Sequence, residues 1–382
     1  MPVSELDHRL VALRQQVREW AADLRPIALE IDRDPDAIND HLDLPAIRYL
    51  STMVIPPEYG APPMTVAGHR FYGMASLERA VVLEELACAD AGTLLAAPGA
   101  SMSGVLVDLL ADEQQKEWFY GQLLERPQWT FFGLTEPNRG SDAGGLRTAL
   151  SADGVLTGEK RYVGNATRAS LGVVFARTRP GPLGIVATLV RTSAPGYTAV
   201  PIDTVGLRGA RIGAITLDRV EIPPEHVLGS HLSAAQRGMW ACVRTFNRLR
   251  PGVAAIALGI ARAAYEYVLA ERDRPGRDGR DRLDVLGRRI EATRRLIRSA
   301  AMSVDANGGH GHLASAAKAR ACRLAEDATL EACELLGPGA RLEHPVLDKL
   351  TRDARGVEFM EGTENMQRLN VFHGYLAGAF GR

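Results

Sequence analysis

The stretch LTEPNRGSDAGG, residues 134–145, lies where the character of the chain changes. Before it, apolar residues recur at the spacing of amphipathic helices, as in HRLVALRQQVREWAADL at residues 8–24. After it come short β-branched runs separated by Gly, Pro and Ser, such as LGVVFAR at residues 171–177. From Ser233 onward the helical period returns, and it predicts long helices over residues 253–272, 283–301, 315–336 and 365–380.

This order of helices, strands and helices predicts an α+β fold, because a doubly wound fold would alternate strand with helix. We expect an N-terminal all-α domain over residues 1–128 and a middle β-rich domain over residues 129–232. Residues 233–382 are expected to form a C-terminal four-helix bundle. A chain of 382 residues is long enough for several such packed domains.

The composition indicates a small-molecule partner. The net charge is −1, from 45 Lys and Arg against 46 Asp and Glu, so we expect neither nucleic acid nor an anionic membrane as a partner. The N-terminal MPVSELDHRL carries charges where a signal peptide has an apolar run, and the four cysteines are scattered. We also expect that no apolar stretch is long enough to span a membrane. We therefore expect a cytoplasmic protein. Aromatic residues make up only 6%, which predicts an aliphatic core.

Several chemistries have no sequence support. The chain has no GxGxxG after a strand, no GxxxxGK[ST] and no GxSxG, which argues against Rossmann, P-loop and serine-hydrolase sites. His310 and His312 stand in a Gly-rich GGHGH stretch without a nearby Cys or carboxylate cluster. A solvated turn between helices is favoured there, and we expect no metal site.

The stretch at residues 134–145 has the composition of a ligand-binding loop. Turns are forced by Pro137, Gly140, Gly144 and Gly145. Thr135 and Ser141 leave hydroxyl groups and freed backbone N–H groups for an anion or a heteroaromatic ring. The same composition also suits a plain surface turn.

Two further stretches leave their own alternatives open. GEKRYVGNA, residues 158–166, reads as a strand in which Tyr162 offers a flat face, either to the core or to a ligand. In FMEGTENMQRL, residues 359–369, Glu361 precedes a Gly just before an amphipathic helix. A carboxylate at that position is either a helix-start acid or a desolvated general base.

Taken together and in this order, the motifs resemble the acyl-CoA dehydrogenase family, and the resemblance extends over nearly the whole chain. The segments that carry it are IPPEYG (55–60), DEQQK (112–116), LTEPNRGSD (134–142), GEKRYVGN (158–165), GLRG (206–209), VEIPPEHVLG (220–229), AERDRPG (270–276), KLTRDAR (349–355) and MEGT (360–363).

The resemblance implies a helical domain, a β-domain and a helical bundle with FAD between them. It implies that Glu361 takes the α-proton of an acyl thioester while the β-hydrogen leaves as hydride to flavin N5. The backbone N–H of Glu361 would help to hold the thioester oxygen. In some members the base lies instead at the position of Leu249, so this sequence offers only Glu361.

The resemblance also assigns contacts residue by residue. Substrate contacts are expected from Asn247, Arg250 and Gly362. Cofactor contacts are expected from Leu134, Thr135, Gly140, Ser141, Tyr162, Val163, Gly164, Arg272, Gly337, Thr363 and Asn365.

The sequence departs from the family pattern at several of these positions. Gly164 replaces a Thr or Ser that usually hydrogen-bonds flavin N5, and Tyr162 stands where Trp is usual. At the residues that meet a neighbouring subunit's FAD, Arg272 is kept, whereas Pro275 replaces Phe and Leu283 replaces Gln. The family's QxxGG reads ELLGP, residues 334–338. A carboxylate at Glu334 would oppose a phosphate unless it turns away or pairs with an Arg.

Three functional hypotheses follow. The first is an FAD-dependent dehydrogenase of an acyl thioester, carried on CoA or on an acyl carrier protein, that forms a homodimer or homotetramer and passes electrons to an electron-transfer flavoprotein or oxygen. The second is a flavin-dependent monooxygenase or oxidase, favoured by Gly164 and opposed by the retained Glu361. The third is one subunit of a hetero-oligomeric dehydrogenase, favoured by the altered cross-subunit residues.

Overall fold

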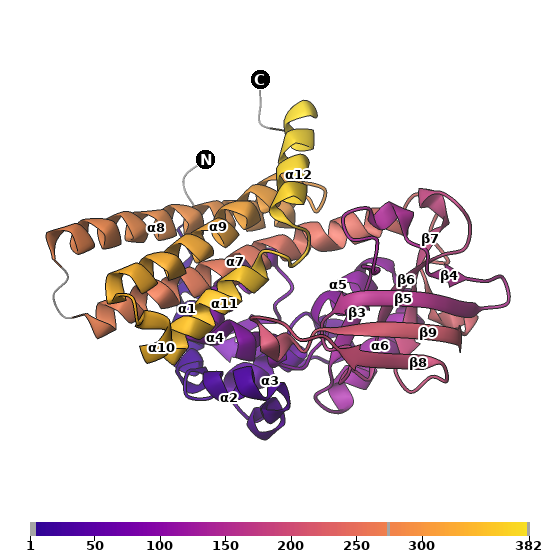
Figure 1. Ribbon diagram of the computed structural model, residues 1–382. Helices are drawn as coiled ribbons and strands as arrows, with labels where there is room; N and C mark the ends of the chain where they lie inside the picture. Colours follow the sequence, from indigo (N-terminus) through magenta and orange to yellow (C-terminus); the bar gives the residue numbers. More distant parts are fainter. Residues whose placement is uncertain (1–4, 273–275, 380–382) are drawn as a thin grey trace.

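The computed structural model describes residues 5–272 and 276–379, and its elements follow the predicted order of helices, sheet and helices (Figure 1). The α+β fold expected from the sequence is confirmed. Figure 1 shows the C-terminal helices stacked at one end of the molecule and the sheet at the other, with α7 running between them.

The N-terminal part is mainly helical. Its first helix begins where the Asp7 carboxylate accepts a hydrogen bond from the Leu10 N–H at 2.8 Å. A short hairpin of β1 and β2 interrupts these helices and was not predicted, because three-residue strands leave too little alternation to detect. The elements are α1 (His8–Ala21), α2 (Ala28–Arg33), α3 (Pro45–Thr52), β1 (Met64–Val66), β2 (His69–Phe71), α4 (Ser76–Ala96), α5 (Ser101–Leu110) and α6 (Glu113–Glu125).

The middle part is one sheet whose strands run in the order β10-β7-β6-β4-β5-β9-β8, with β3 paired in parallel to β6. The two strands expected at residues 158–166 and 171–177 correspond to β5 and β6. The pairing of β5 with β9 shifts register between Lys160 and Val163. The strands are β3 (Thr130–Gly133), β4 (Ala149–Leu150), β5 (Val155–Val163), β6 (Leu171–Arg177), β7 (Ile185–Arg191), β8 (Tyr197–Pro201), β9 (Gly213–Glu221) and β10 (Val227–Leu228).

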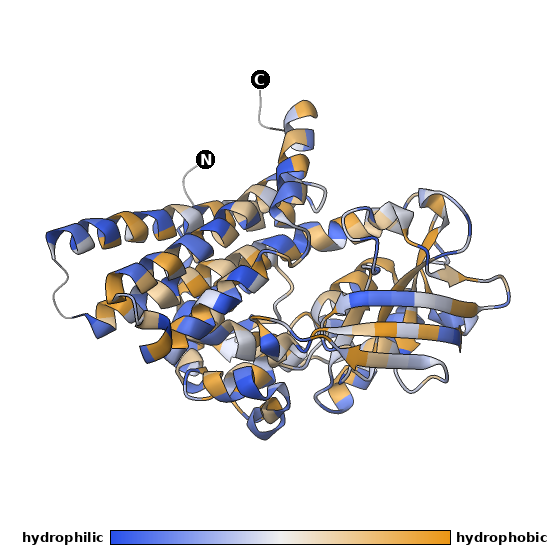
Figure 2. Cartoon of the chain, in the orientation of Figure 1, coloured by the Kyte–Doolittle hydropathy of each residue, from blue (hydrophilic) through white to orange (hydrophobic). Residues whose placement is uncertain are grey.

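The C-terminal part is helical, and its four predicted segments correspond to α7, α8, α9 and α12. Figure 2 shows hydrophilic and hydrophobic residues alternating along α8, as an amphipathic period requires. Helix α12 projects from the end of the bundle (Figure 1). The predicted end of that segment at residue 380 lies outside the described residues. The helices are α7 (Met239–Glu271), α8 (Arg277–Ala306), α9 (Gly311–Leu336), α10 (Ala340–Glu343), α11 (Pro345–Val357) and α12 (Glu364–Leu376).

Two differences from the expected helices have physical reasons. Helix α7 begins at Met239 rather than near Val253, because Pro251 lies inside it and a proline normally signals a helix boundary. Helix α11 was not predicted. Its buried face includes Lys349 and Asp353, and these charged residues hide the apolar period.

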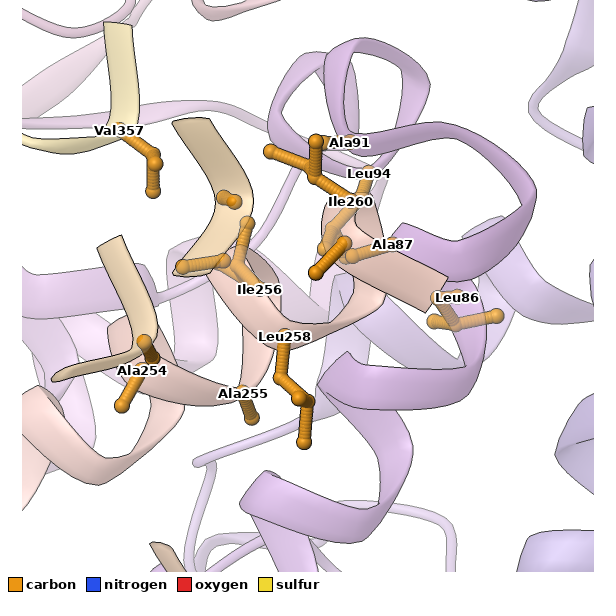
Figure 3. Close-up of a cluster of buried hydrophobic side chains, with 14 of the residues drawn as sticks. Leu86, Ala87, Ala91, Leu94, Ala254, Ala255, Ile256, Leu258, Ile260 and Val357 are labelled. Atoms are coloured by element: carbon orange, nitrogen blue, oxygen red, sulfur yellow. The ribbon is translucent and has the colours of Figure 1, made fainter. Parts of the chain in front are cut away.

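The main core is aliphatic and rich in alanine, as expected from the low aromatic content. Figure 3 shows Ala254, Ala255, Ile256 and Leu258 of α7 near α4 side chains such as Leu86. A Cβ built on Gly259 would lie 2.8 Å from the Cys88 backbone nitrogen, so a glycine is needed where α7 crosses α4. Small residues therefore let these helices approach closely.

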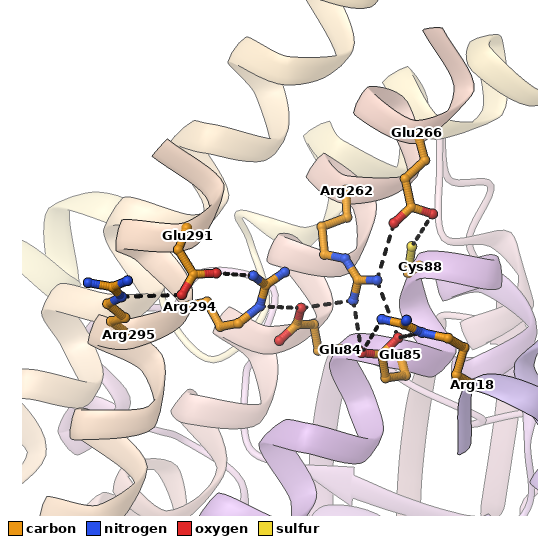
Figure 4. A network of polar contacts seen from close by, with 9 residues as sticks. All are labelled: Arg18, Glu84, Glu85, Cys88, Arg262, Glu266, Glu291, Arg294 and Arg295. Carbon is orange, nitrogen blue, oxygen red and sulfur yellow. Dashed lines mark hydrogen bonds and ion pairs between the residues drawn. The ribbon is translucent and has the colours of Figure 1, made fainter. Parts of the chain in front are cut away.

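A buried network of charges ties α4, α7 and α8 together (Figure 4). Arg262 Nη1 lies 2.8 Å from Glu84 Oε1 and 3.2 Å from Glu85 Oε1. Arg294 Nε donates to the same Glu84 oxygen at 2.9 Å. The three helices are thus joined by shared carboxylates where the surrounding packing is apolar.

One described helix, α7, is long and apolar enough by length and composition to cross a membrane. The sequence expectation that no stretch qualifies is therefore wrong for this helix. However, 67% of its most apolar window is buried inside the protein, as in the core helix of a soluble fold.

Candidate active site

Glu361 lies in the turn between α11 and α12, and its backbone has a φ of +52°, in the left-handed region. Gly362 follows with a φ of +99°. The turn is held by buried Gln367, whose Nε2 donates to the carbonyl oxygens of Glu361 at 3.1 Å and Gly362 at 2.8 Å. Two consecutive left-handed residues are costly without such support, and glycine at the second position lowers that cost.

A second group holds the same turn from α9. The ammonium of Lys318 donates to the carbonyl of Glu358 at 2.7 Å and also to the carbonyl of Gly362. Lys318 was not identified as a functional residue from the sequence. The available signal was a lysine at the helical spacing of the buried residues Ala314, Ala317 and Ala321, where a charge is unexpected.

The predicted substrate residue Arg250 is buried on α7. Its Nη1 donates to Asn247 Oδ1 at 3.1 Å, and its guanidinium lies 5.5 Å from the centre of the Phe246 ring. Asn247 in turn donates through Nδ2 to the carbonyl of Gly308 at 3.2 Å. The structure therefore buries Asn247 behind Arg250, between α7 and the loop before α9.

The Glu361 carboxylate is poised between two protonation states. Its Oε2 is buried and has no hydrogen-bond partner among the described residues. Burial raises the pKa of Glu361 to about 7, while the positive charges of Arg250, Lys318 and Arg79 oppose that rise. A desolvated carboxylate with a pKa near neutrality is suited to accept a proton at physiological pH.

The loop that begins at Leu134 is anchored from beneath. Lys160 Nζ on β5 donates to the Leu134 carbonyl at 3.1 Å and lies 3.0 Å from Glu136 Oε1. The Glu136 carboxylate also accepts from the backbone N–H groups of Arg147 at 2.6 Å and Thr148 at 2.8 Å. One buried ion pair thus fixes both ends of the loop, and neither member was assigned a role from the sequence.

The anchored loop leaves its predicted ligand-binding residues near the surface. Thr135 is half-buried, whereas Gly140 and Ser141 are exposed. A Cβ built on Gly140 would meet nothing within 4 Å, so this part of the loop has open space beside it.

The end of β5 presents the next predicted group of cofactor residues. The register shift before Val163 accompanies a φ of +59° at Tyr162, whose side chain is 61% exposed beneath the Arg161 guanidinium. Val163 is buried. A Cβ on Gly164 would meet only the Ala210 carbonyl oxygen, at 3.8 Å, so the space beside Gly164 is open. Tyr162 is not a core residue, which removes one of its two sequence interpretations.

An aromatic contact connects the β-domain with the Glu361 side of the site. Phe132 on β3, two residues before Leu134, has its ring centre 6.0 Å from that of Phe246 on α7. Phe246 in turn contacts Arg250. The loop anchor and the buried Arg250 therefore lie on either side of this aromatic pair.

Thr363 and Asn365, two predicted cofactor residues, line a cavity of about 330 Å³ at the start of α12. Its wall holds an aromatic ring, three cationic residues and three carboxylates, namely Phe359, Lys318, Arg323, Arg355, Glu326, Glu358 and Glu364. Arg355 pairs with Glu326 at 2.6 Å. Thr363 is the N-cap residue of α12, but its side chain makes no capping hydrogen bond. The cavity adjoins the Glu361 turn through Lys318.

Arg272 and Gly337 lie far from this cavity. Leu336, beside Gly337, is 18 residues beyond Lys318 on α9, about 27 Å along the helix axis at 1.5 Å per residue. Arg272 donates to the Leu335 carbonyl at that far end. The structure therefore brings Arg272 and Gly337 together but separates both from Glu361.

The altered residues near Arg272 have identifiable environments. Glu334 pairs with Arg282 of α8, with 2.5 Å between Oε2 and Nη2. Leu283 is buried in the core. Pro275 lies outside the described residues.

Among the described residues no group of three or more His, Cys, Asp or Glu side chains is arranged to hold a metal ion. His310 and His312 lie with ring centres 6.1 Å apart.

Comparisons with known proteins cover most of the chain. Residues 131–220 match the family model for the acyl-CoA dehydrogenase middle domain, and residues 236–376 match that for the acyl-CoA dehydrogenase C-terminal domain. An acyl-CoA dehydrogenase of Bacillus subtilis is 33% identical over 282 residues, covering 70% of this chain and 73% of the relative.

Solved structures share the whole fold. Butyryl-CoA dehydrogenase from Megasphaera elsdenii superposes with a TM-score of 0.83 at 27% identity, covering 98% of this chain and 99% of its own. A prolyl acyl carrier protein oxidase superposes equally well, with a TM-score of 0.83 at 22% identity over 99% and 100% of the two chains. The second likeness concerns the fold alone.

Proposed function

The chain belongs to the acyl-CoA dehydrogenase family, and on that premise we propose that Glu361 removes the α-proton of an acyl thioester. The protein is an FAD-dependent oxidoreductase that acts on CH–CH bonds. When bound, FAD supplies the acceptor for the hydride that leaves the β-carbon. The single observation that best supports the proposal is the buried Oε2 of Glu361, which has no protein partner among the described residues.

The surroundings of Glu361 suit this role. An α-proton is weakly acidic, so its base must be strong and shielded from water, and the developing negative charge must be stabilised. Burial strengthens the carboxylate as a base, because it raises the pKa to about 7. Arg250 and Lys318 place positive charge beside it. We propose that the backbone N–H of Glu361 helps to hold the thioester oxygen.

The residues present also fit FAD. Open space beside Gly140 and Gly164 leaves room for a planar ring against the backbone. The cavity at the start of α12 offers the hydroxyl of Thr363 and the amide of Asn365 to a polar part of the cofactor. Its three cationic residues are balanced by three glutamates, so it carries no excess of positive charge. Leu134, Thr135, Ser141, Tyr162 and Val163 would hold the cofactor from the β-domain.

The test is anaerobic mixing of the FAD-loaded protein with a panel of acyl thioesters on CoA and on acyl carrier protein. We expect at least one thioester to bleach the flavin absorbance. Replacing Glu361 with Gln should slow that bleaching by about 10²- to 10⁴-fold, since a general base contributes that much. Equally fast bleaching in the Glu361→Gln variant would show that Glu361 is not the base. The thioesters that bleach the flavin will show whether the acyl group is carried on CoA or on acyl carrier protein.

The open space beside Gly164 favours a second candidate, an acyl-thioester oxidase. In that reaction the same two hydrogens leave the substrate, and oxygen accepts both electrons and is released as hydrogen peroxide. Oxygen consumption and peroxide, equal to the thioester oxidised, would support it. A Gly164→Ser variant should then react more slowly with oxygen, because the side chain narrows that space. Slow reoxidation by oxygen in the unaltered protein would exclude this candidate.

We further propose a homo-oligomer. Helix α12 exposes Leu369, Phe372 and Leu376, which share one face at i, i+3 and i+7, and such a stripe suits burial against another copy. The pairing of Glu334 with Arg282 also neutralises the carboxylate at the expected cross-subunit position. Light scattering measures the molar mass of the pure protein. A mass of two or four chains, with one FAD bound per chain, would support this proposal. A requirement for a second, different chain before FAD binds would support a hetero-oligomer.

A further inference from the structure

Lys318 differs from the other lysines of the chain in its partners. Lys116, Lys160 and Lys349 each lie within 4 Å of a carboxylate oxygen. Lys318 is only 1% exposed, yet its ammonium donates to two carbonyl groups, those of Glu358 and Gly362. Burying an ammonium is unfavourable, so a lysine in an alanine-rich helix face requires a specific compensating interaction.

Those two carbonyls belong to the turn that carries Glu361. Glu358 lies three residues before Glu361, and Gly362 directly follows it. The Lys318 ammonium therefore bridges the turn from α9, while Gln367 holds it from α12. Burial lowers the pKa of Lys318, whereas the nearby Glu361 and Glu358 carboxylates raise it. The two carbonyl acceptors also favour the protonated amine, which places a positive charge beside the Glu361 carboxylate.

We propose that Lys318 is the positioning residue of the Glu361 base, locking the left-handed turn through two carbonyls and supplying a charge that keeps the carboxylate ionised near neutral pH. This inference rests on the proposed role of Glu361. It assigns Lys318 no contact with substrate.

The other charges that face Glu361 come from different elements. Arg250 on α7 donates to Asn247, and Arg79 on α4 donates to the carbonyls of Gly73 at 2.8 Å and Arg248 at 2.8 Å. Both arginines oppose the raised pKa of Glu361, as Lys318 does. On the turn itself, the Glu358 carboxylate accepts from the Glu364 N–H at 2.8 Å. Of these groups, Lys318 alone is bonded to both sides of Glu361 in the chain.

The charge that Lys318 supplies predicts a shift in the pH dependence of flavin bleaching when this residue is replaced. In a Lys318→Gln variant the Glu361 carboxylate loses one stabilising cation, so its pKa should rise further. We expect the acid limb of thioester-dependent flavin bleaching to move to higher pH by about 1 unit. A purely structural role would lower the rate without moving the limb.

The matched control is Arg320→Gln, which removes one positive charge from the exposed face of the same helix, two residues away. Its pH profile should coincide with that of the unaltered protein. An unmoved acid limb in a folded, FAD-loaded Lys318→Gln variant would overturn the proposal.

A second variant covers the case in which Lys318→Gln does not retain FAD. Lys318→Arg keeps the charge, but a planar guanidinium does not reproduce the two carbonyl contacts of an ammonium. We expect flavin bleaching to be slower at every pH, while the acid limb of its pH profile keeps the midpoint of the unaltered protein. A shifted midpoint would contradict the proposal.

The Glu361→Gln variant separates the two proposals. If it bleaches as fast as the unaltered protein, the role of Glu361 is wrong and the Lys318 inference falls with it. If the Glu361→Gln variant bleaches slowly while the acid limb of the Lys318→Gln variant is unmoved, only the inference about Lys318 fails.

Discussion

Lys160 Nζ lies 3.0 Å from Glu136 Oε1, and both side chains are buried beneath the loop that begins at Leu134. One charge from strand β5 and one from the loop itself are thus taken out of water to hold the loop. A buried pair of this kind is costly to break, because the remaining charge has no partner. The loop that we propose for FAD therefore depends on residues that do not themselves face the ligand.

Replacing Lys160 with Met should destabilise the protein by about 3–5 kcal/mol and speed the release of FAD, because the buried Glu136 carboxylate loses its cation. Urea unfolding and the fluorescence of released FAD measure the two effects. Arg48→Met, which breaks an exposed pair with Asp43, is the control and should cost at most about 1 kcal/mol. Equal losses of unfolding free energy in the two variants would contradict the claim that burial makes the Lys160–Glu136 pair costly to break.

The raised pKa of Glu361 predicts opposite trends for rate and stability. Flavin bleaching should increase as pH rises through about 7, since the base must be deprotonated. Between its ordinary pKa of 4.5 and about 7, the folded state holds a proton that the unfolded state has lost. The free energy of unfolding therefore falls as pH rises through this window. Denaturation of the Glu361→Gln variant should lack that slope, and an identical slope in both proteins would assign it elsewhere.

The pairing of Arg282 with Glu334 predicts a rescue experiment. If Glu334 faces the FAD phosphates of a neighbouring subunit, Arg282→Met should weaken FAD binding by about 5-fold, equivalent to about 1 kcal/mol. Adding Glu334→Gln to that variant should restore binding, because the repelling charge is gone. Equilibrium titration with FAD measures both. A double variant that binds no better than Arg282→Met would place the phosphates away from Glu334.

The network in Figure 4 predicts unequal roles for two arginines. Arg262→Met leaves Glu84 and Glu85 with less compensation in a buried site, so we expect a loss of about 3–5 kcal/mol in unfolding free energy. Arg295 is 57% exposed and pairs with Glu291 four residues earlier, so Arg295→Met should cost at most about 0.5 kcal/mol. Urea denaturation compares the two, and similar losses would argue against the network as a buried unit.

Motifs and helical periods could be recognised wherever their signal is local. The β6 run at residues 171–177 was identified from neighbouring residues alone. Glu361 became the candidate base through the resemblance of its MEGT motif to the family. The α11 helix was missed, because its buried face carries Lys349 and Asp353, which compensate one another only when folded. Lys318 was missed for a similar reason, since its acceptors lie 40 and 44 residues away in the chain.

The sequence by itself determined the order of helices and strands, the family resemblance and the identity of the candidate base. Those features depend on the spacing of residues that are close together in the chain, and on short motifs such as MEGT. The tertiary structure alone decided which charges surround Glu361 and which pair anchors the loop at Leu134. Desolvation and Coulomb energies depend on distances between α4, α7 and α9, and those distances exist only once the helices have packed.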